Sequence, residues 1–314
     1  MPGYDKVLIT GGAGFIGSNL AGSLLEQGYG VLAYDNLLTG KRENLLEYES
    51  NENFTFVEGD ILDFKKLSEK IADAKYVLHQ AALPSVARSV KDPRTTNRVN
   101  IEGTLNVLTA AKDGGVKRVV LASSSSVYGD TPELPKREDM PYNPLSPYAV
   151  TKVTKELYSG VFSQLYEFPV ACLRYFNVYG PKQDPKSEYA AVIPKFITSA
   201  LKDEPLTIEG DGLQTRDFTY IEDVVQANIK AMKGKAAGNF NIAYGENISI
   251  KGLAEKIVTL ISSSSEIVHK APRPGDVRDS LADITEAQRE LGYNPEYNLD
   301  MGLEKTIEWF RNRI

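Results

Sequence analysis

The sequence predicts an α/β fold built on a doubly wound parallel sheet. Short apolar runs rich in β-branched residues alternate with longer segments of helical periodicity, as expected for parallel strands buried beneath helices. A glycine-rich turn joins the first apolar run to the first helical segment. Beyond residue 175 the alternation loosens into shorter elements, which predicts a smaller, interleaved C-terminal α/β lobe. We therefore expect a sheet domain over residues 1–175 and a second part over residues 176–314, some of whose segments return to the sheet.

Composition limits the classes of function. A chain of 314 residues can bury a large core, and its net charge of -6 argues against nucleic acid as the main partner. Cys172 is the only cysteine, so no intrachain disulfide is expected, and its place in the apolar run 170–173 predicts a buried thiol. The two histidines, His79 and His269, are too few for a typical histidine metal site or triad, so we expect no metal.

The apolar segments also bear on location. None reaches the roughly 20 residues that cross a bilayer, and the chain starts without a charged leader and apolar signal core. We therefore expect a cytoplasmic protein without a membrane partner.

The glycine turn lies between the first predicted strand, residues 7–9, and a helix predicted over residues 18–27. Glycines at such a turn let backbone N–H groups approach a pyrophosphate and let the helix pack closely on the strand. This context predicts a dinucleotide site and a Rossmann-like sheet around it. The expected cofactor contacts in the turn are Gly11, Gly14, Phe15, Ile16 and Gly17.

The second predicted strand, residues 31–34, ends at Asp35. A carboxylate at this strand end accepts hydrogen bonds from a ribose 2′-hydroxyl and repels a 2′-phosphate, which favours NAD over NADP. A solvated turn aspartate is the alternative interpretation, and the nearby cations Lys41 and Arg42 leave NADP open. The cofactor site is also expected to include Asn36 and Gly40.

Two further strands are predicted at residues 54–57 and 76–79. The residues that follow them are expected to contact the cofactor, where small side chains let a dinucleotide lie against the backbone. These residues are Asp60 and Ile61, beside the adenine, and Gln80, Ala81 and Ala82. His79 is expected to pack in or beside the sheet. A helix predicted over residues 96–112 carries Asn100, which is expected either to join the cofactor site by bonding across to a strand or to be exposed.

The fifth predicted strand, residues 118–122, opens into four serines, residues 123–126, at the edge where parallel sheets bind ligands. Farther along, Ser146 and Pro147 predict the start of a helix that continues to about residue 166. Tyr148 and Lys152 project from one face of this helix, because they are four residues apart. An ammonium beside a phenol favours the phenolate, which is a general base for a sugar hydroxyl. With 17 tyrosines in the chain such a pair also arises by chance, so its meaning depends on its companions.

Four features now occur in one order along the chain: the glycine turn, the strand-end acid, the serine strand and the Tyr148–Lys152 pair. In this combination the chain resembles the extended short-chain dehydrogenase/reductase family over essentially its whole length. The resemblance implies an NAD-dependent enzyme with the catalytic residues Ser124, Tyr148 and Lys152. Tyr148, Lys152 and Tyr175 are then also expected to contact the cofactor.

The second half resembles the nucleotide-sugar lobe of the UDP-hexose 4-epimerases. Arginines in its loops suit bidentate contact with a diphosphate, although a single such arginine is more often a surface residue. The resemblance implies that the UDP diphosphate is held by Asn177, Arg216 and Arg273, the ribose by Asp276, and the uracil beside Ala191 and Val192. The expected substrate contacts also include Ser85, Ser125 and Tyr148, with Ser124 bonding the sugar O4.

The serine motif separates the reactions of such enzymes. Sugar-nucleotide 4,6-dehydratases carry an Asp-Glu pair within it, whereas this chain has Ser124, Ser125 and Ser126, which argues against elimination of water. UDP-glucuronate decarboxylases also place a glutamate there. UDP-glucuronate 4-epimerases share the four serines but usually carry Thr at the position of Asn177, so they are the closer alternative. The expected reaction is reversible inversion at C4 of a UDP-hexose, and a non-catalytic protein that senses NAD is the remote alternative.

Substrate size is expected to depend on Ser280. In the resembling epimerases this position walls the hexose pocket, and a bulky Tyr there excludes an N-acetyl group. Serine leaves room for UDP-GlcNAc and UDP-GalNAc beside UDP-Glc and UDP-Gal, unless it is simply a small residue without a selective role. The family also implies a homodimer formed through the helices around residues 96–112 and 148–166.

Overall fold

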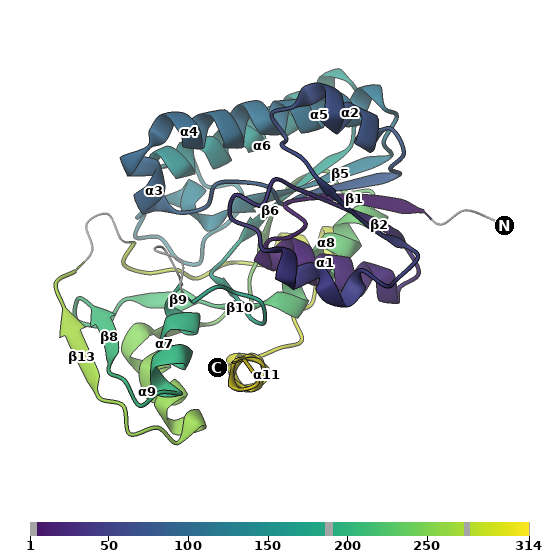
Figure 1. The fold of residues 1–314 in the computed structure, drawn as a ribbon. Helices are drawn as coiled ribbons and strands as arrows, with labels where there is room; N and C mark the ends of the chain where they lie inside the picture. Colours follow the sequence, from purple (N-terminus) through teal and green to yellow (C-terminus); the bar gives the residue numbers. More distant parts are fainter. Residues whose placement is uncertain (1–4, 186–190, 273–276, 314) are drawn as a thin grey trace.

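The computed structural model describes residues 5–185, 191–272 and 277–313. Its centre is a seven-stranded parallel sheet (Figure 1). From one edge to the other, the strands are β11 (Gly238–Ile242), β6 (Val170–Tyr175), β5 (Arg118–Ser124), β4 (Tyr76–His79), β1 (Lys6–Thr10), β2 (Gly30–Asp35) and β3 (Phe54–Glu58). The strand order reverses between β1 and β4, which places the ligand-binding crevice at their carboxyl ends. The predicted doubly wound α/β fold is confirmed.

The central strands are buried on both faces, which is why they are continuous apolar runs rather than alternating ones. Val7 and Ile9 of β1 pack with Leu20 of the first helix on one face of the sheet. Leu8, between them, packs with Val107 on the other face. Cys172 of β6 lies in the second core cluster, and burial raises the pKa of its thiol to about 12. The prediction of a buried thiol is confirmed.

Helices cover both faces of the sheet, as Figure 1 shows. One face carries α1 (Phe15–Glu26) and α8 (Ile221–Lys233), which pack against each other. The other carries α2 (Phe64–Ile71), α5 (Gly103–Asp113) and α6 (Pro147–Leu165). The long helix α6 therefore lies along the sheet with one side against β5 and β6.

The single helix predicted over residues 96–112 is wrong in detail. After α3 (Val86–Lys91), the chain forms α4 (Pro93–Asn97), a π-helical turn η2 (Arg98–Glu102) and then α5. The wide turn contains Asn100, whose side chain bonds to the backbone of Leu83. Such a π turn is typically a single wide turn within a longer helix, and periodicity alone does not reveal it.

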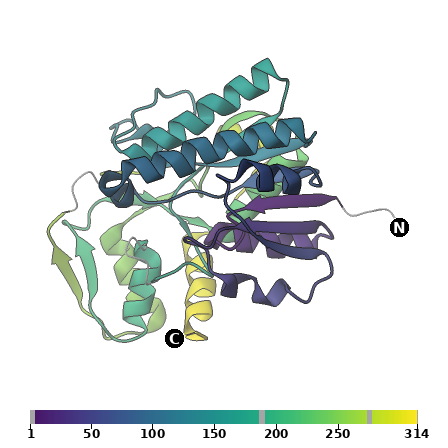
Figure 2. The ribbon, with the colours of Figure 1, turned by 45° about the horizontal axis from the view of Figure 1, so that its top comes forward.

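The C-terminal part forms a smaller lobe beside the carboxyl edge of the sheet. It contains three two-stranded sheets, β10–β7, β12–β9 and β13–β8, with helices packed on them. Its elements are β7 (Val178–Tyr179), α7 (Val192–Ala200), β8 (Leu206–Glu209), β9 (Thr215–Asp217), β10 (Thr219–Tyr220), β12 (Asn247–Ser249), α9 (Ile250–Ile261), β13 (Ile267–Lys270), α10 (Thr285–Leu291) and α11 (Leu299–Arg311). Figure 2 shows α11, in yellow, between the green helices of the lobe and the purple N-terminal part.

The two parts of the chain are interleaved rather than consecutive. Strand β11 comes from the C-terminal part but joins the central sheet beside β6, and α8 covers the same sheet. Two short 3-10 helices, η1 (Arg42–Tyr48) and η3 (Ser125–Tyr128), follow β2 and β5 at the carboxyl edge. Within the described residues, no helix has the length and apolar character that a membrane crossing requires.

Candidate active site

A cleft of about 820 Å³ opens at the carboxyl ends of the central strands. Residues from both parts of the chain line it, from the glycine turn and the end of β2 to the start of α6 and the loop after β7. Every predicted cofactor contact except Asn100 lines this cleft: Gly11, Gly14, Phe15, Ile16, Gly17, Asp35, Asn36, Gly40, Asp60, Ile61, Gln80, Ala81, Ala82, Tyr148, Lys152 and Tyr175.

The glycine turn is closed too tightly for larger residues. Gly11 has φ +71°, and a Cβ on it would lie 2.7 Å from the backbone N of Ala81. A Cβ on Gly17 would lie 2.1 Å from the carbonyl O of Gly11. Helix α1 starts at Phe15, three residues earlier than predicted, with Gly14 as an N-cap that supplies no side chain and no acid in the first turn. Phe15, Ile16 and Gly17 of this uncapped first turn line the cleft, so the N-terminus of α1 offers a site for an anion such as a pyrophosphate.

Asp35 ends β2 as a buried carboxylate. Its Oδ2 accepts the N–H of Ala13 at 3.0 Å, and its Oδ1 accepts the N–H of Leu37 at 2.8 Å. Burial raises the pKa of this carboxyl, and the two backbone bonds oppose that effect. The acid is thus fixed at the edge of the cleft, where a ribose 2′-hydroxyl fits and a 2′-phosphate meets a carboxylate.

Lys41 and Arg42, the two cations that leave NADP as an alternative cofactor, each contact an acidic side chain. Lys41 Nζ lies 3.0 Å from Asp184, and Arg42 Nε lies 2.7 Å from Glu49. The guanidinium of Arg42 also lies over the ring of Phe56, 4.4 Å from its centre. These contacts favour the interpretation of Asp35 as an NAD determinant.

The segment after β7 bridges to η1 across the cleft. Lys182 Nζ lies 2.6 Å from Glu47 and donates to the hydroxyl of Tyr48 at 2.8 Å. Gln183, next along the chain, lines the cleft, and its Oε1 is buried without a hydrogen-bond partner among the described residues. An orphaned acceptor of this kind is suited to a ligand donor.

The predicted catalytic residues meet at the inner part of the cleft. Ser124 ends β5, and its Oγ accepts the N–H of Ser126 at 3.2 Å. Helix α6 starts as predicted, with Pro147 in its first turn and Ser146 Oγ accepting the N–H of Ala149 at 3.1 Å.

Tyr148 and Lys152 come from the first two turns of α6, and with Ser124 they line the cleft. Lys152 Nζ lies 5.5 Å from the centre of the Tyr148 ring and donates to the carbonyl of Ala122 at 2.8 Å. The site therefore combines a hydroxyl, a phenol and an ammonium.

Asn100 does not line the cleft. It is fully buried behind the wall, where it accepts the N–H of Leu83 at 2.7 Å and donates to Thr151 Oγ1 at 3.1 Å. It thus links the cleft wall to α6. His79 is also fully buried, with its ring nitrogens bonded to the hydroxyls of Thr10 and Thr104. Burial lowers its pKa well below the usual value, which confirms that it packs within the sheet.

Three of the predicted substrate contacts, Ser85, Asn177 and Ala191, line the cleft beside Ser124 and Tyr148. Ser85 has φ +102°, and Asn177 has φ +31° with its Nδ2 donating to the carbonyl of Asp217 at 3.0 Å. Strained backbone of this kind is concentrated at ligand sites.

The other predicted substrate contacts do not line the cleft or are not described. Arg216 donates to the carbonyls of Thr215 and Arg278. Ser280 is buried, and its N–H bonds to the carbonyl of Thr215 at 3.2 Å. Ser125 starts η3 and Val192 starts α7. Arg273 and Asp276 lie outside the described residues.

Sequence reasoning missed several cleft residues. Arg88, one turn into α3, places a cation in the lining, and Lys41, Gln183 and Asp184 line the outer end. Thr39 and Leu83 follow the carboxyl ends of strands whose next residues were already predicted to bind the cofactor. The rule that parallel sheets bind ligands at this edge would therefore have found them too. Gln183 and Asp184 follow a two-residue strand of the lobe, and nothing in the local sequence indicates that they reach the cofactor half.

A dinucleotide fits this cleft on the evidence of the chain itself. The crowded glycine turn, the uncapped first turn of α1, the carboxylate of Asp35 and the orphaned Oε1 of Gln183 offer suitable partners. In the part of the chain that the structure describes, no group of three His, Cys, Asp or Glu side chains is placed to hold a metal ion.

Comparisons with known proteins agree with this geometry. The profile of the family described as GDP-mannose 4,6 dehydratase matches residues 8–306. A UDP-glucose 4-epimerase of Mycolicibacterium smegmatis is 42% identical over 98% of this chain and 99% of its own length.

Two solved structures extend the likeness to the fold. A UDP-N-acetylglucosamine 4-epimerase from Methanobrevibacter ruminantium, solved with UDP-N-acetylmuramic acid, is 39% identical with a TM-score of 0.95, covering 99% of this chain and all of that one. A UDP-glucuronic acid 4-epimerase from Bacillus cereus, solved with UDP-glucuronic acid and NAD, is 36% identical with a TM-score of 0.91, covering 98% and 99%.

Proposed function

Because the chain belongs to the family described as GDP-mannose 4,6 dehydratase, within the extended short-chain dehydrogenases/reductases, we propose that it inverts C4 of UDP-hexoses with bound NAD. The observation that carries this proposal is the meeting of Ser124, Tyr148 and Lys152 in a cleft that also holds the glycine turn. One relative of similar length is named a UDP-glucose 4-epimerase, and another was solved with UDP-glucuronic acid and NAD, which agrees with that chemistry.

The cofactor contacts follow from the cleft. The glycine turn and the first turn of α1 would hold the pyrophosphate, Asp35 the adenosine ribose, and Asp60 and Ile61 the adenine. Lys152 and Tyr148 lie at the opposite, inner end, where the nicotinamide would be. Bound NAD supplies an acceptor and donor for the C4 hydride at that end.

Side chains of the protein itself move the O4 proton and orient the sugar. Tyr148, as phenolate, removes the O4 proton, and Lys152 stabilises that phenolate by its charge. Ser124 bonds O4 and so aligns the sugar with Tyr148. Inversion requires that the 4-keto sugar turn over within the cleft while the UDP stays fixed. The UDP contacts proposed on the lobe side are Asn177, Ala191, Val192, Arg216, Arg273 and Asp276.

The residues around Ser124 favour epimerisation over elimination of water. A dehydratase needs an acid and a base beside the sugar in addition to the phenol, whereas Ser125 and Ser126 follow Ser124 here. Among the described residues that line the cleft, the carboxylates are Asp35, Asp60 and Asp184, and none of them belongs to β5 or α6, the elements that carry Ser124 and Tyr148.

We further propose that the enzyme takes UDP-GlcNAc and UDP-GalNAc as well as UDP-Glc and UDP-Gal. This rests on the small Ser280 and on likeness to an epimerase of UDP-N-acetylglucosamine. UDP-glucuronate is the second candidate, supported by the likeness to the B. cereus enzyme and by Arg88, a cation in the cleft lining that suits a carboxylate.

A panel of four UDP-sugars separates these candidates. Values of kcat/KM are measured with one enzyme preparation for UDP-GlcNAc, UDP-Glc, UDP-Gal and UDP-glucuronate, and the four values are compared. We expect both hexose classes to be converted and UDP-glucuronate to be converted at least tenfold more slowly. Preference for UDP-glucuronate would transfer the assignment to the second candidate, and inactivity on all four would leave the remote alternative of an NAD sensor.

We also propose a homodimer formed through α6. Val150, Leu157, Val161 and Leu165 recur at helical spacing on one face of this helix, and each is about half exposed or more. Sedimentation of the wild type and of Leu157→Glu tests this: a dimer that the charge dissociates is expected, and a wild-type monomer would contradict the proposal.

A further inference from the structure

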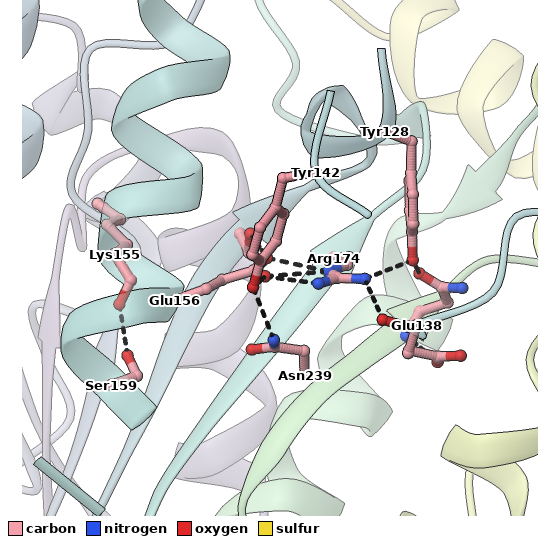
Figure 3. Close-up of polar contacts among 10 residues, drawn as sticks. Tyr128, Glu138, Tyr142, Lys155, Glu156, Ser159, Arg174 and Asn239 are labelled. Carbon is pink, nitrogen blue, oxygen red and sulfur yellow. Dashed lines mark hydrogen bonds and ion pairs between the residues drawn. The ribbon is translucent and has the colours of Figure 1, made fainter. Parts of the chain in front are cut away.

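A buried ion pair lies on the side of α6 that faces the sheet, beyond the catalytic residues. Glu156, one turn after Lys152, and Arg174 of β6 have side chains that are 0% and 1% exposed. Arg174 Nη2 lies 2.7 Å from Glu156 Oε2, and its Nε donates to both carboxylate oxygens, at 3.0 and 3.2 Å. Figure 3 shows Arg174 between Glu156 on one side and Tyr128 on the other.

The surrounding groups satisfy both members of the pair. Ser123 donates its hydroxyl to Glu156 Oε1, and Tyr142 donates to Oε2 at 3.0 Å. Arg174 Nη1 donates to the hydroxyl of Tyr128 at 2.7 Å and to the carbonyl of Glu138 at 3.2 Å. Burial alone would lower the pKa of Arg174, but its bonds to Glu156 and the charge of that carboxylate raise it overall. Arg174 therefore stays a cation in the folded protein, held against the carboxyl group of Glu156.

Stability does not explain this arrangement well. Desolvating two charges costs about as much as their attraction returns, and apolar residues of similar volume often replace buried pairs without loss. A bidentate guanidinium–carboxylate contact differs from apolar packing in its fixed geometry. The pair is thus better suited to setting a position than to adding stability.

The position that the pair sets is that of α6 on two neighbouring strands. Ser123 of β5 and Arg174 of β6 are directly paired across the sheet, and Glu156 binds both. The next residue on each strand, Ser124 and Tyr175, lines the cleft. One turn earlier on α6, Lys152 bonds to Ala122, the residue before Ser123.

Glu156 therefore anchors the helix that carries Tyr148 and Lys152 to the strand that carries Ser124. Tyr148 lies two turns, or about 12 Å, along α6 from this anchor. A small rotation or slide of the helix at Glu156 moves the phenol relative to the Ser124 hydroxyl.

We propose that Glu156, held by Arg174 and Ser123, is a positioning residue that fixes the rotation and height of α6 and so aligns Tyr148 and Lys152 with Ser124. This inference rests on the proposed epimerase function. It assigns no contact with substrate or cofactor to Glu156 or Arg174, which act through the helix.

The test removes both charges together. Glu156→Leu combined with Arg174→Met leaves the net charge of the protein unchanged. Any effect on the site then reflects a change in the position of α6 rather than a change in net charge. The matched control is Glu286→Leu combined with Arg289→Met, which removes an exposed pair whose atoms lie 2.6 Å apart. Thermal unfolding and bound-cofactor content are measured first, then kcat and KM.

We expect the buried double variant to keep its cofactor and its KM within about twofold, while kcat falls about 10- to 100-fold, the usual cost of misplacing a reacting group by about 1 Å. A purely structural role predicts lost cofactor or lower thermal stability with an unchanged kcat per cofactor-loaded enzyme, and that result would overturn the proposal, as would wild-type kcat. If the double variant does not fold, Glu156→Gln is tested instead. This variant keeps the shape of the side chain but loses the charge-assisted bidentate contact with Arg174, and the same results would support or overturn the proposal.

An activity-independent readout separates this inference from the proposed function. Crystal structures of the wild type, the buried double variant and the control give the distance between the hydroxyl oxygens of Tyr148 and Ser124. This distance is expected to change by about 1 Å in the buried double variant and to stay the same in the control. A wild type that converts no UDP-sugar would defeat the epimerase assignment alone, whereas an unchanged distance in the buried double variant would defeat the positioning role alone.

Discussion

Lys152 Nζ lies 5.5 Å from the centre of the Tyr148 ring, one turn away on α6, while it donates a hydrogen bond to the carbonyl of Ala122 at 2.8 Å. The ammonium is therefore fixed to β5, the strand that ends in Ser124. This hydrogen bond joins α6 to β5, two elements that are distant in sequence, within one site. The proposed chemistry depends on that juxtaposition.

Tyr148→Phe removes the general base without changing the shape of the ring. We expect kcat to fall by about 10²- to 10⁴-fold, the range that general acid–base groups contribute, with unchanged cofactor content. Tyr158→Phe, on the same helix, is the matched control and should keep its activity. Near wild-type turnover by Tyr148→Phe would remove this residue from the mechanism.

Ser280→Tyr introduces a bulky side chain at the position that the family resemblance assigns to the wall of the hexose pocket. We expect loss of UDP-GlcNAc and UDP-GalNAc conversion with retention of UDP-Glc and UDP-Gal conversion, measured as the ratio of kcat/KM for the two classes. The structure buries Ser280 beside Thr215 rather than in the cleft lining, so the prediction rests on the family resemblance. Equal turnover of both classes by wild type and variant would show that Ser280 has no selective role.

The cofactor half was predictable because each of its features is local. A strand, a glycine turn and a helix follow one another directly at residues 6–26, and the carboxyl ends of parallel strands meet at one edge. Asp35, Ala81 and the serines at 123–126 were therefore assigned to one edge of the sheet from the order of strands, and the family resemblance singled out Ser124. The π turn around Asn100 was not predicted, because apolar spacing does not distinguish a single wide turn from regular α-helix.

The lobe was harder to predict for a related reason. Arg216, expected at the diphosphate, instead bonds to the carbonyls of Thr215 and Arg278, and nothing in its local sequence signals that choice. The link between Lys182 and η1 joins segments more than 130 residues apart. The Glu156–Arg174 pair has the same character: a glutamate on a helix usually indicates a solvated face, and its burial follows only from the packing of α6 on the sheet.

Lys182→Met breaks the bridge between the segment after β7 and η1. The Nζ of Lys182 contacts Glu47 and Tyr48, and the adjacent Gln183 and Asp184 line the cleft. We expect bound cofactor to dissociate about tenfold faster, equivalent to about 1.4 kcal/mol. The measurement is cofactor content after gel filtration and dilution, with Lys305→Met, at an exposed pair with Glu222, as the control. Equal retention in all three proteins would refute this role for the bridge.

Asp217 gives a pH dependence to stability. Its fully buried carboxyl accepts the N–H groups of Tyr244, Gly245 and Ala282, and burial, opposed by those bonds, raises its pKa to about 7. Between the unfolded value near 4 and pH 7, the folded state keeps a proton that the unfolded chain has lost, so stability falls as pH rises. The upper limit of this effect is about 4 kcal/mol.

Asp217→Asn should remove that part of the pH dependence. Urea unfolding of both proteins at pH 5 and pH 8 gives the difference, and comparing variant with wild type cancels groups that titrate in the same window, such as Asp223 and His79. Exposed Asp73→Asn is the control. The same loss of stability between the two pH values in wild type and Asp217→Asn would contradict the assignment.

The most direct measurement is conversion of UDP-GlcNAc to UDP-GalNAc by the purified protein without added cofactor, with UDP-Glc assayed alongside. The account predicts that both sugars approach an equilibrium mixture of C4 epimers, because the cleft retains NAD through purification. Absence of any C4 epimer from either sugar, even after NAD is supplied, would contradict the proposed function.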